Sequence, residues 1–373
     1  MKYAYDLQSH LTCAYFTPIG QPAVGFTWDA LGRSTSETAG TSISGGGCST
    51  NGRTTSYAYD AAGDVTSITW PDASPNTLVA NYSYDVLGRL IKILRSAQHV
   101  GDYHYDAFGR RSEVDRNGGS GATTTYAYDG ADRLQTLTQA LTGTGAVTYT
   151  QAYDPAGGLV SSALTNTAYA WHPALGSTAY TVNGLNQYPT VGGAATAYDV
   201  TANLTCLGYT TSCTGTAYTY DTENRLLSAN APTPVSLAYD PLGRLITKSA
   251  ASATTFLYAG SMLIGEYDSA GNILARYVPG PGQDEAAMWY AGTGVAMPQW
   301  LHADPMGSTI AWSNTTGGAI GTQAYDPYGQ PSSWSGGPRY AFTGQLMIGE
   351  AQLYHYKARA YSPALGRFMQ TDP

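Results

Sequence analysis

Pairs of tyrosines separated by one residue, each followed by a short polar turn, recur along the whole chain. The clearest copy is Tyr-Ser-Tyr-Asp-Val-Leu-Gly-Arg-Leu at residues 82–90. In a β-strand, residues two apart point to the same face, so both rings lie on one side of a sheet. The Asp caps backbone N–H groups of a turn, and the Gly adopts the positive φ that a three-residue hairpin loop requires. The Arg begins the return strand beside the Asp or a Tyr ring, so each copy predicts one β-hairpin.

The aromatic-Asp core of this pattern returns at intervals of 21 to 31 residues through the first part of the chain. Its Asp residues there are Asp6, Asp29, Asp60, Asp85, Asp106, Asp129 and Asp154. A degenerate copy follows, in which Asn183 replaces the Asp and Gln187 the Arg, before the series resumes at Asp199, Asp221, Asp240 and Asp268. Each interval has the length of two strands and two turns, so we expect an all-β array of hairpins that extend one continuous sheet.

The composition changes after about residue 275, where the Tyr-Asp pattern recurs less often and Pro, Trp and Met become more frequent. We place a domain boundary within the Pro-Gly-Pro-Gly run at residues 279–282. Residues 1–279 are predicted to form the hairpin array, and residues 280–373 a different C-terminal region.

Composition supports a β protein and excludes several functions. The chain has 31 Tyr against 6 Phe, 44 Gly, 19 Pro and only 12% charged residues, which favours strands and turns over disorder or a helical bundle. The net charge of −8, with no basic block, argues against a nucleic-acid partner. No apolar run is long enough to span a membrane. The histidines lack metal or triad spacing and no phosphate loop is present, so we expect no metal and no cofactor.

The cysteines leave their pairing open. Cys206 and Cys213 flank a six-residue loop that can close a short disulfide hairpin in an oxidising compartment. Two unpaired thiols fit the same spacing.

The repeat and the C-terminal stretch together resemble the RHS-repeat, or YD-repeat, family, which includes bacterial polymorphic toxins, the C component of insecticidal toxin complexes and the teneurins. The tyrosine pattern is similar to the YD repeat. His-Ala-Asp-Pro-Met-Gly-Ser at 302–308, Tyr-Asp-Pro-Tyr-Gly at 325–329, Tyr-Ala-Phe-Thr-Gly-Gln at 340–345 and the block at 353–373 are similar, in order, to the RHS repeat-associated core domain.

This resemblance implies a spiral sheet that forms part of a hollow shell, with the core curling inward at one end. It implies a C-terminal toxic segment as cargo and a bacterial protein that is secreted or on the cell surface. From the residues alone, a solid β-helix or an open curved sheet fits the repeat equally well. The chain is short for a closed shell, so its exposed strand edges predict pairing with another shell-forming chain or an N-terminal portion.

The resemblance also implies a self-cleaving aspartyl protease, in which two carboxylates share a proton. Matched by motif, Asp372 is the first carboxylate and Arg359 the assisting cation. The second Asp and the cleaved bond belong to a later block, beyond Pro373, so we expect no activity from the chain as given.

Other roles remain open for these residues. The repeat Asp residues could bind calcium, but turn capping and pairing with Arg fit them better. The Tyr pairs could stack on sugars, but a packed ladder is simpler. The alternative function is an extracellular adhesion or carbohydrate-binding module with a cell-surface glycan as partner and no cargo. A remnant left by recombination is a third possibility.

Overall fold

The structure is a computed structural model that describes the 373-residue chain except residues 18–21, 42, 45–46, 50, 171–175 and 372–373. Almost all regular structure in the described residues is β-strand. The helices there are single 3-10 turns: η1 (Asn117–Gly119), η2 (Gly143–Gly145), η3 (Thr167–Tyr169) and η4 (Phe342–Gly344). None of them is long and apolar enough to cross a membrane.

The first sheet has 14 strands, each paired antiparallel with the next along the chain. In spatial order they are β1 (Lys2–Tyr5), β2 (Leu11–Tyr15), β3 (Ala23–Trp28), β4 (Ser34–Thr41), β7 (Arg53–Tyr59), β8 (Val65–Thr69), β9 (Val79–Tyr84), β10 (Leu90–Arg95), β11 (Gln98–Tyr105), β12 (Arg111–Asp115), β13 (Thr123–Tyr128), β14 (Leu134–Ala140), β15 (Val147–Tyr153) and β16 (Leu159–Leu164). A separate two-stranded ribbon, β5 (Ile43–Ser44) and β6 (Gly47–Cys48), extends from the loop after β4.

The second sheet has 15 strands in the same sequential order. They are β17 (Tyr180–Thr181), β18 (Thr190–Val191), β19 (Ala194–Tyr198), β20 (Leu204–Tyr209), β21 (Cys213–Tyr220), β22 (Leu226–Ala229), β23 (Val235–Tyr239), β24 (Leu245–Ser249), β25 (Ala253–Ala259), β26 (Met262–Asp268), β27 (Ile273–Pro279), β28 (Ala286–Ala291), β29 (Pro298–Ala303), β30 (Thr309–Ser313) and β31 (Ala319–Thr322). A third sheet contains β32 (Leu346–Ile348), β33 (Leu353–Tyr356), β34 (Arg359–Ser362) and β35 (Arg367–Phe368).

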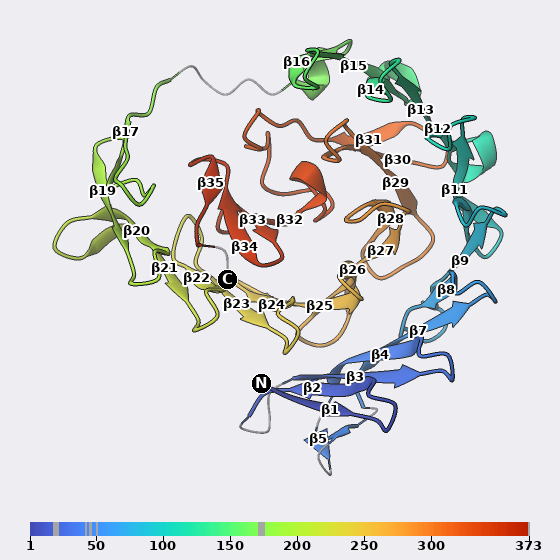
Figure 1. Ribbon diagram of the computed structural model, residues 1–373, viewed down its shortest axis with the longest axis horizontal. Coiled ribbons are helices and arrows are strands. Elements are labelled where there is room, and N and C mark those ends of the chain that lie inside the picture. The colour runs from blue at the N-terminus through green and yellow to red at the C-terminus, as the bar shows by residue number, and fades with distance from the viewer. Residues whose placement is uncertain (18–21, 42, 45–46, 50, 171–175, 372–373) are drawn as a thin grey trace.

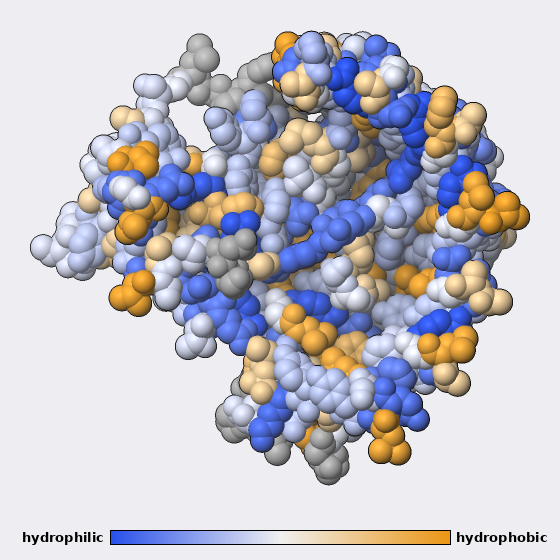
Figure 2. Space-filling model, viewed as in Figure 1, coloured by the Kyte–Doolittle hydropathy of each residue, from blue (hydrophilic) through white to orange (hydrophobic). Residues whose placement is uncertain are grey.

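The sheets form a curved wall around the third sheet (Figure 1). The first sheet runs from the bottom of that view up the right side to the top. The second begins on the left, passes along the bottom and rises inside the first, and β32 to β35 lie in the centre. Figure 2 shows hydrophobic side chains scattered along the rim and hydrophilic ones over the middle of the same face. The expected all-β hairpin array is therefore confirmed.

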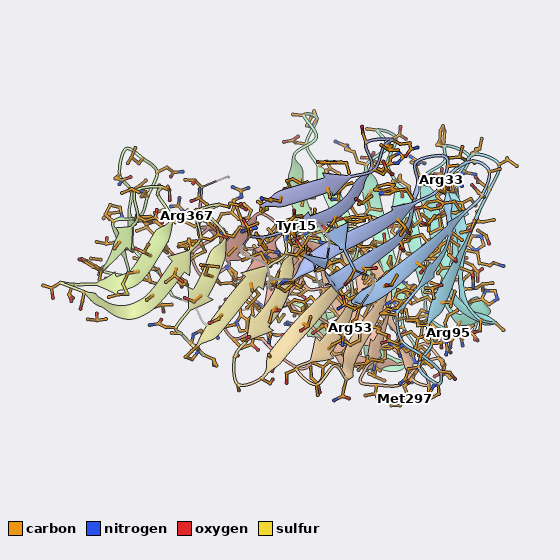
Figure 3. All side chains as sticks on the ribbon, turned by 90° about the horizontal axis from the view of Figure 1, so that it is seen from below. Tyr15, Arg33, Arg53, Arg95, Met297 and Arg367 are labelled. Carbon is orange, nitrogen blue, oxygen red and sulfur yellow. A yellow bond between two sulfur atoms is a disulfide. The ribbon has the colours of Figure 1, made fainter. Side chains whose placement is uncertain are left out.

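The two large sheets pack against each other where they overlap. Buried side chains from β8 to β12 and from β25 to β29 belong to one hydrophobic cluster. The buried indole of Trp70 donates a hydrogen bond of 2.9 Å to the carbonyl of Ile264, and that of Trp300 one of 2.9 Å to the carbonyl of Val100. Arg53, labelled in Figure 3, reaches across with its guanidinium 4.0 Å from the centroid of the Tyr267 ring.

The array is divided in two, whereas the sequence pattern predicted one continuous sheet. The first sheet ends at β16, whose side chains are mostly exposed, and the second begins at the two-residue strand β17. Between them Asn166 accepts a hydrogen bond of 3.1 Å from the N–H of Ala168, which turns the chain into η3 and out of the strand direction. The degenerate copy at Asn183 follows this division.

The predicted boundary at residue 279 does not coincide with the end of a sheet. Strand β27 ends at Pro279 and pairs with β28 directly across the Pro-Gly-Pro-Gly loop. The second sheet continues to Thr322, and in the C-terminal region the strands β32 to β35 form a sheet of their own. The division into residues 1–279 and 280–373 stays a prediction based on sequence texture.

Candidate functional site

The repeated turn has the geometry that its residue types predict. In the turn at residues 85–89, the Oδ1 atom of Asp85 accepts hydrogen bonds from the N–H groups of Leu87 (2.9 Å) and Arg89 (3.0 Å). Its Oδ2 atom accepts one of 2.7 Å from Nε of Arg89. The side-chain and backbone hydrogen bonds from Arg89 lower the pKa of Asp85. Gly88 closes the turn with a φ of 74°, as a three-residue hairpin loop requires.

Where a turn ends in Arg, this residue joins the turn to the next hairpin. Its guanidinium lies over a Tyr of that hairpin, for example 4.6 Å between Arg89 and the centroid of Tyr105. The Tyr105 hydroxyl donates a hydrogen bond of 2.7 Å to the carbonyl of Leu90. The arrangement recurs with Arg33 over Tyr59, Arg110 over Tyr128, Arg133 over Tyr153, Arg225 over Tyr239 and Arg244 over Tyr258.

In several pairs the first Tyr faces the hydrophobic core: Tyr82, Tyr103 and Tyr218 are each at most 8% exposed, whereas Tyr3 near the start of the chain is 47% exposed. Where one ring is buried and the other is covered by an Arg, as at Tyr103 and Tyr105, the pair is packed and does not present an open platform for a sugar ring. The repeat Asp carboxylates accept hydrogen bonds from turn N–H groups, as turn capping predicts, and several of them also bind the Arg at the end of the turn.

The turn of Asp240 and Arg244 has a further role. Asp240 is 1% exposed, and Arg244 binds it at 2.7 Å while also pairing with Glu37 of β4 in the first sheet. Burial raises the pKa of Glu37, although the charge of Arg244 acts to lower it. This ion pair ties one sheet to the other and was not predicted, because nothing local marks residues that are separated by 207 positions.

The third sheet lies inside the wall and is attached to it by polar contacts. Lys357 Nζ lies 2.7 Å from Oδ2 of Asp284, and Gln345 donates a hydrogen bond of 3.0 Å to the same oxygen. Between this sheet and the strands β22 to β26 is a cavity of about 410 Å³, mainly apolar. Its charged or titratable lining comes from Glu223, Arg225, Arg244, Asp284, His355 and Lys357.

The end of the described chain folds back onto the start of the second sheet. The carbonyl of Met369 accepts a hydrogen bond of 2.9 Å from the N–H of Leu204, and the hydroxyl of Thr371 donates one of 3.1 Å to the carbonyl of Thr201. Arg367, labelled in Figure 3, donates one of 2.7 Å to the carbonyl of Asn186. The residues before Asp372 are therefore held against the inner side of the wall.

The predicted catalytic pair is described only in part. Arg359 begins β34, and its guanidinium lies 3.7 Å from the centroid of the Phe368 ring on β35. Asp372 lies outside the described residues. The Arg359 side chain therefore faces the strand that leads to Asp372, and the catalytic role of both residues stays a prediction.

The cysteines are placed at bonding distance in pairs. The sulfur atoms of Cys206 and Cys213 are 1.98 Å apart across the hairpin of β20 and β21. Those of Cys13 and Cys48 are 1.99 Å apart and join β2 to the ribbon strand β6. The second pairing has a sequence separation of 35, and the sequence offered no local signal for it.

The chain was compared with curated proteins, and it matches nucleases over about half its length. It is 27% identical over 203 residues to the tRNA nuclease WapA of Bacillus subtilis strain 168, covering 51% of this chain and 8% of that protein. It is 26% identical over 203 residues to the tRNA3(Ser)-specific nuclease WapA of Bacillus spizizenii, with the same coverage of 51% and 8%. The chain thus spans less than a tenth of the length of these relatives.

Solved structures share the fold. The structure of TcdB2-TccC3 superimposes with a TM-score of 0.66 at 15% identity, covering 94% of this chain and 23% of that one. TcdB2-TccC3 without its hypervariable C-terminal region gives a TM-score of 0.65 at 15% identity, covering 94% and 22%. A family model described as the teneurin YD-shell matches residues 1–171 and 197–373. The segment between the two matched parts contains the degenerate copy at Asn183 and the start of the second sheet. The chain belongs to the teneurin YD-shell family.

Proposed function

We propose that this chain is a wall segment of a shell that encloses a polypeptide following it in a longer bacterial protein of the RHS toxin type. The observation that carries the proposal is the inward position of the third sheet (Figure 1). Because Met369 and Thr371 are bonded to Leu204 and Thr201 on the wall, a segment that followed Pro373 would begin inside the curve. The names of the curated relatives, which are nucleases, support a toxic cargo.

The function of such a wall is steric. A continuous antiparallel sheet leaves no unpaired backbone between its strands, so a protein target can reach the cargo only around an edge or through an opened contact. The ion pairs and the shared hydrophobic cluster hold the first and second sheets together, so that no opening forms between them. This role implies that the protein acts outside the producing cell, because the wall keeps the toxin from its target until the toxin is delivered.

Release of the cargo is proposed to occur by self-cleavage in the longer protein. Asp372 would share a proton with a second carboxylate that follows Pro373, so that one acts as general base and the other as general acid. The positive charge of Arg359 would favour the ionised form of that pair. The stacking of Arg359 on Phe368 supports this role, because it fixes the cation on the strand that leads to Asp372.

Intact mass tests the release step. The protein is produced from its native reading frame carried beyond Pro373, as wild type, as Asp372→Asn and as Asp326→Asn. The last variant is a matched control, because Asp326 also precedes a proline in the C-terminal region. We expect two masses, with the cut beyond Pro373, for the wild type and the control, and one mass for Asp372→Asn. One mass for the wild type, or two for Asp372→Asn, would refute the assignment.

A further inference from the structure

A cluster of metal-ligating side chains lies on strands β11 and β12, outside the region discussed so far. His104, Glu113 and Asp115 each offer one ligand atom, and these atoms all lie within 4.8 Å of one another. His104 and Glu113 are directly opposite each other in the antiparallel register. Glu113 and Asp115 are two residues apart on one strand, so all three side chains share a face.

This face is the one turned away from the core. The neighbouring residues Tyr103 and Val114 are 4% exposed each and belong to the cluster between the two large sheets. Since side chains alternate along a strand, His104 and Glu113 point outward. The His104 side chain is 52% exposed, so the cluster is open to an ion from solution.

Several carboxylates gather on this face, and Glu113 is the one without a partner among the described residues. Asp102 lies directly opposite Asp115, and like charges in that position destabilise a sheet. Asp102 has Lys92 at 3.4 Å and His99 at 2.5 Å as partners. No hydrogen bond or ion pair joins Glu113 to another residue in the part of the chain that the structure describes. Two carboxylates and an imidazole therefore lie together on this face, an arrangement that a cation would stabilise.

The ligand types and their support favour a transition metal. Imidazole nitrogen with two carboxylate oxygens suits zinc and similar borderline ions better than calcium, which prefers oxygen ligands alone. The ligand atoms around zinc are roughly 3 to 4 Å apart, and the three atoms here already lie within 4.8 Å of one another. Asp115 is already oriented, because Thr123 of β13 donates a hydrogen bond of 3.1 Å to its Oδ1 atom and His104 lies 3.2 Å from Oδ2.

We propose that His104, Glu113 and Asp115 bind one divalent transition metal ion, for which zinc is the probe, on the outer face of the wall. The ion joins β11 to β12 and cancels the repulsion between their carboxylates. Three protein ligands leave a coordination position for water or for a group from outside the chain. The cysteine sulfurs do not compete for the ion, because they are paired with each other.

Isothermal titration with zinc chloride under non-reducing conditions tests this site. The wild type is expected to bind one ion per chain, and Glu113→Gln and His104→Ala to raise the Kd at least about tenfold. His10→Ala is the matched control, because His10 pairs with Asp6 at 3.1 Å and belongs to no three-residue group among the described residues. It is expected to bind as the wild type does.

Thermal unfolding with and without zinc provides a second measurement. A site present only in the folded chain raises the Tm of the wild type and of His10→Ala, and not that of Glu113→Gln. Because Glu113→Gln replaces an outward carboxylate by an amide of the same shape, its Tm without zinc shows that it folds. Absence of saturable binding to the wild type, or equal binding to Glu113→Gln, would overturn the proposal.

Discussion

The guanidinium of Arg89 lies 4.6 Å from the centroid of the Tyr105 ring, which belongs to the next repeat of the array. The same guanidinium is bound to Asp85 within its own turn. One residue therefore stabilises a hairpin and attaches it to its neighbour. This contact recurs along the wall, and a shared hydrophobic cluster and hydrogen bonds such as that of Trp70 to Ile264 join the two large sheets.

We expect the contact between Arg244 and Glu37 to contribute more to stability than an ordinary repeat contact. Arg244→Met leaves Asp240 and Glu37, which are 1% and 3% exposed, without a cation. Loss of one partner of a buried pair costs about 3 to 5 kcal/mol, and the low end applies because Glu37 can take up a proton. Denaturant unfolding followed by tyrosine fluorescence measures the change.

Arg89→Met is the control for that experiment. It removes the same turn contact and the same stacking on a Tyr, but its partner Asp85 is 20% exposed, and Arg89 has no second carboxylate at ion-pair distance among the described residues. We expect a clearly smaller loss of the free energy of unfolding. Equal losses for the two variants would show that Arg244 does not tie the sheets together.

The turn glycine is required for its backbone conformation. Gly88 has a φ of 74°, and a Cβ there would meet only Asp64 Oδ2, at an ordinary contact distance of 3.9 Å, so Gly88→Ala is expected to lower the free energy of unfolding by about 1 kcal/mol through backbone strain. Gly88→Asn is expected to be better tolerated, because Asn224 takes the same place in its own turn with a φ of 60°. A larger loss for Asn than for Ala in thermal unfolding would contradict this explanation.

The two disulfides are expected to differ in their effect. Cys13 and Cys48 close a loop with a separation of 35 residues, and Cys206 and Cys213 one of 7. The entropy of loop closure predicts a loss of about 4 kcal/mol when the first pair is changed to Ser and about 2 to 3 kcal/mol for the second. Equilibrium unfolding of the two double variants measures both losses in the free energy of unfolding. A larger loss for the Cys206 and Cys213 variant than for the Cys13 and Cys48 variant would contradict this prediction.

His355 is expected to make stability depend on pH. Burial lowers the pKa of His355 to about 4, against about 6.5 when it is exposed in the unfolded chain. Between these values the unfolded chain binds a proton that the folded chain does not, so the free energy of unfolding falls as pH falls, by at most about 1.4 kcal/mol per pH unit. His355→Gln removes this contribution.

Unfolding of His355→Gln at a series of pH values between about 4 and 7 measures the slope, whatever the overall stability of the variant. The expected result is a shallower slope than in the wild type. An unchanged slope would show that His355 does not remain neutral in the folded chain.

The local part of the fold was predictable from the sequence. The roles of Asp, Gly and Arg in each turn follow from residues that lie within nine positions of one another, as at residues 82–90, and the structure confirms them. A turn of this kind is specified by hydrogen bonds between near neighbours, so its residue types are sufficient to identify it.

The long-range contacts were not predictable. Glu37 with Arg244 and Trp70 with Ile264 join residues about two hundred positions apart, and no spacing or motif marks them as partners. The change from one sheet to two was missed because the turn at Asn183 still forms, with Gln187 donating a backbone hydrogen bond of 2.9 Å. The residue pattern identifies turns, which are local, whereas the end of a sheet depends on whether the edge strand forms hydrogen bonds with another strand.

The predicted catalytic residues rest on a different kind of inference. Arg359 and Asp372 follow from a resemblance alone, since an Arg and an Asp-Pro pair have ordinary structural roles in most proteins. The structure adds the position of Arg359 on β34 against Phe368.

The enclosure of a following segment by this wall is tested most directly by limited proteolysis of the protein carried beyond Pro373 in its native reading frame. Mass spectrometry follows the rate at which peptide bonds after Pro373 are cut, beside the same segment as a free peptide. We predict that these bonds are protected in the folded protein and become sensitive in Arg244→Met under conditions that separate the sheets. Cutting at the rate of the free peptide, while the wall remains folded, would contradict the account.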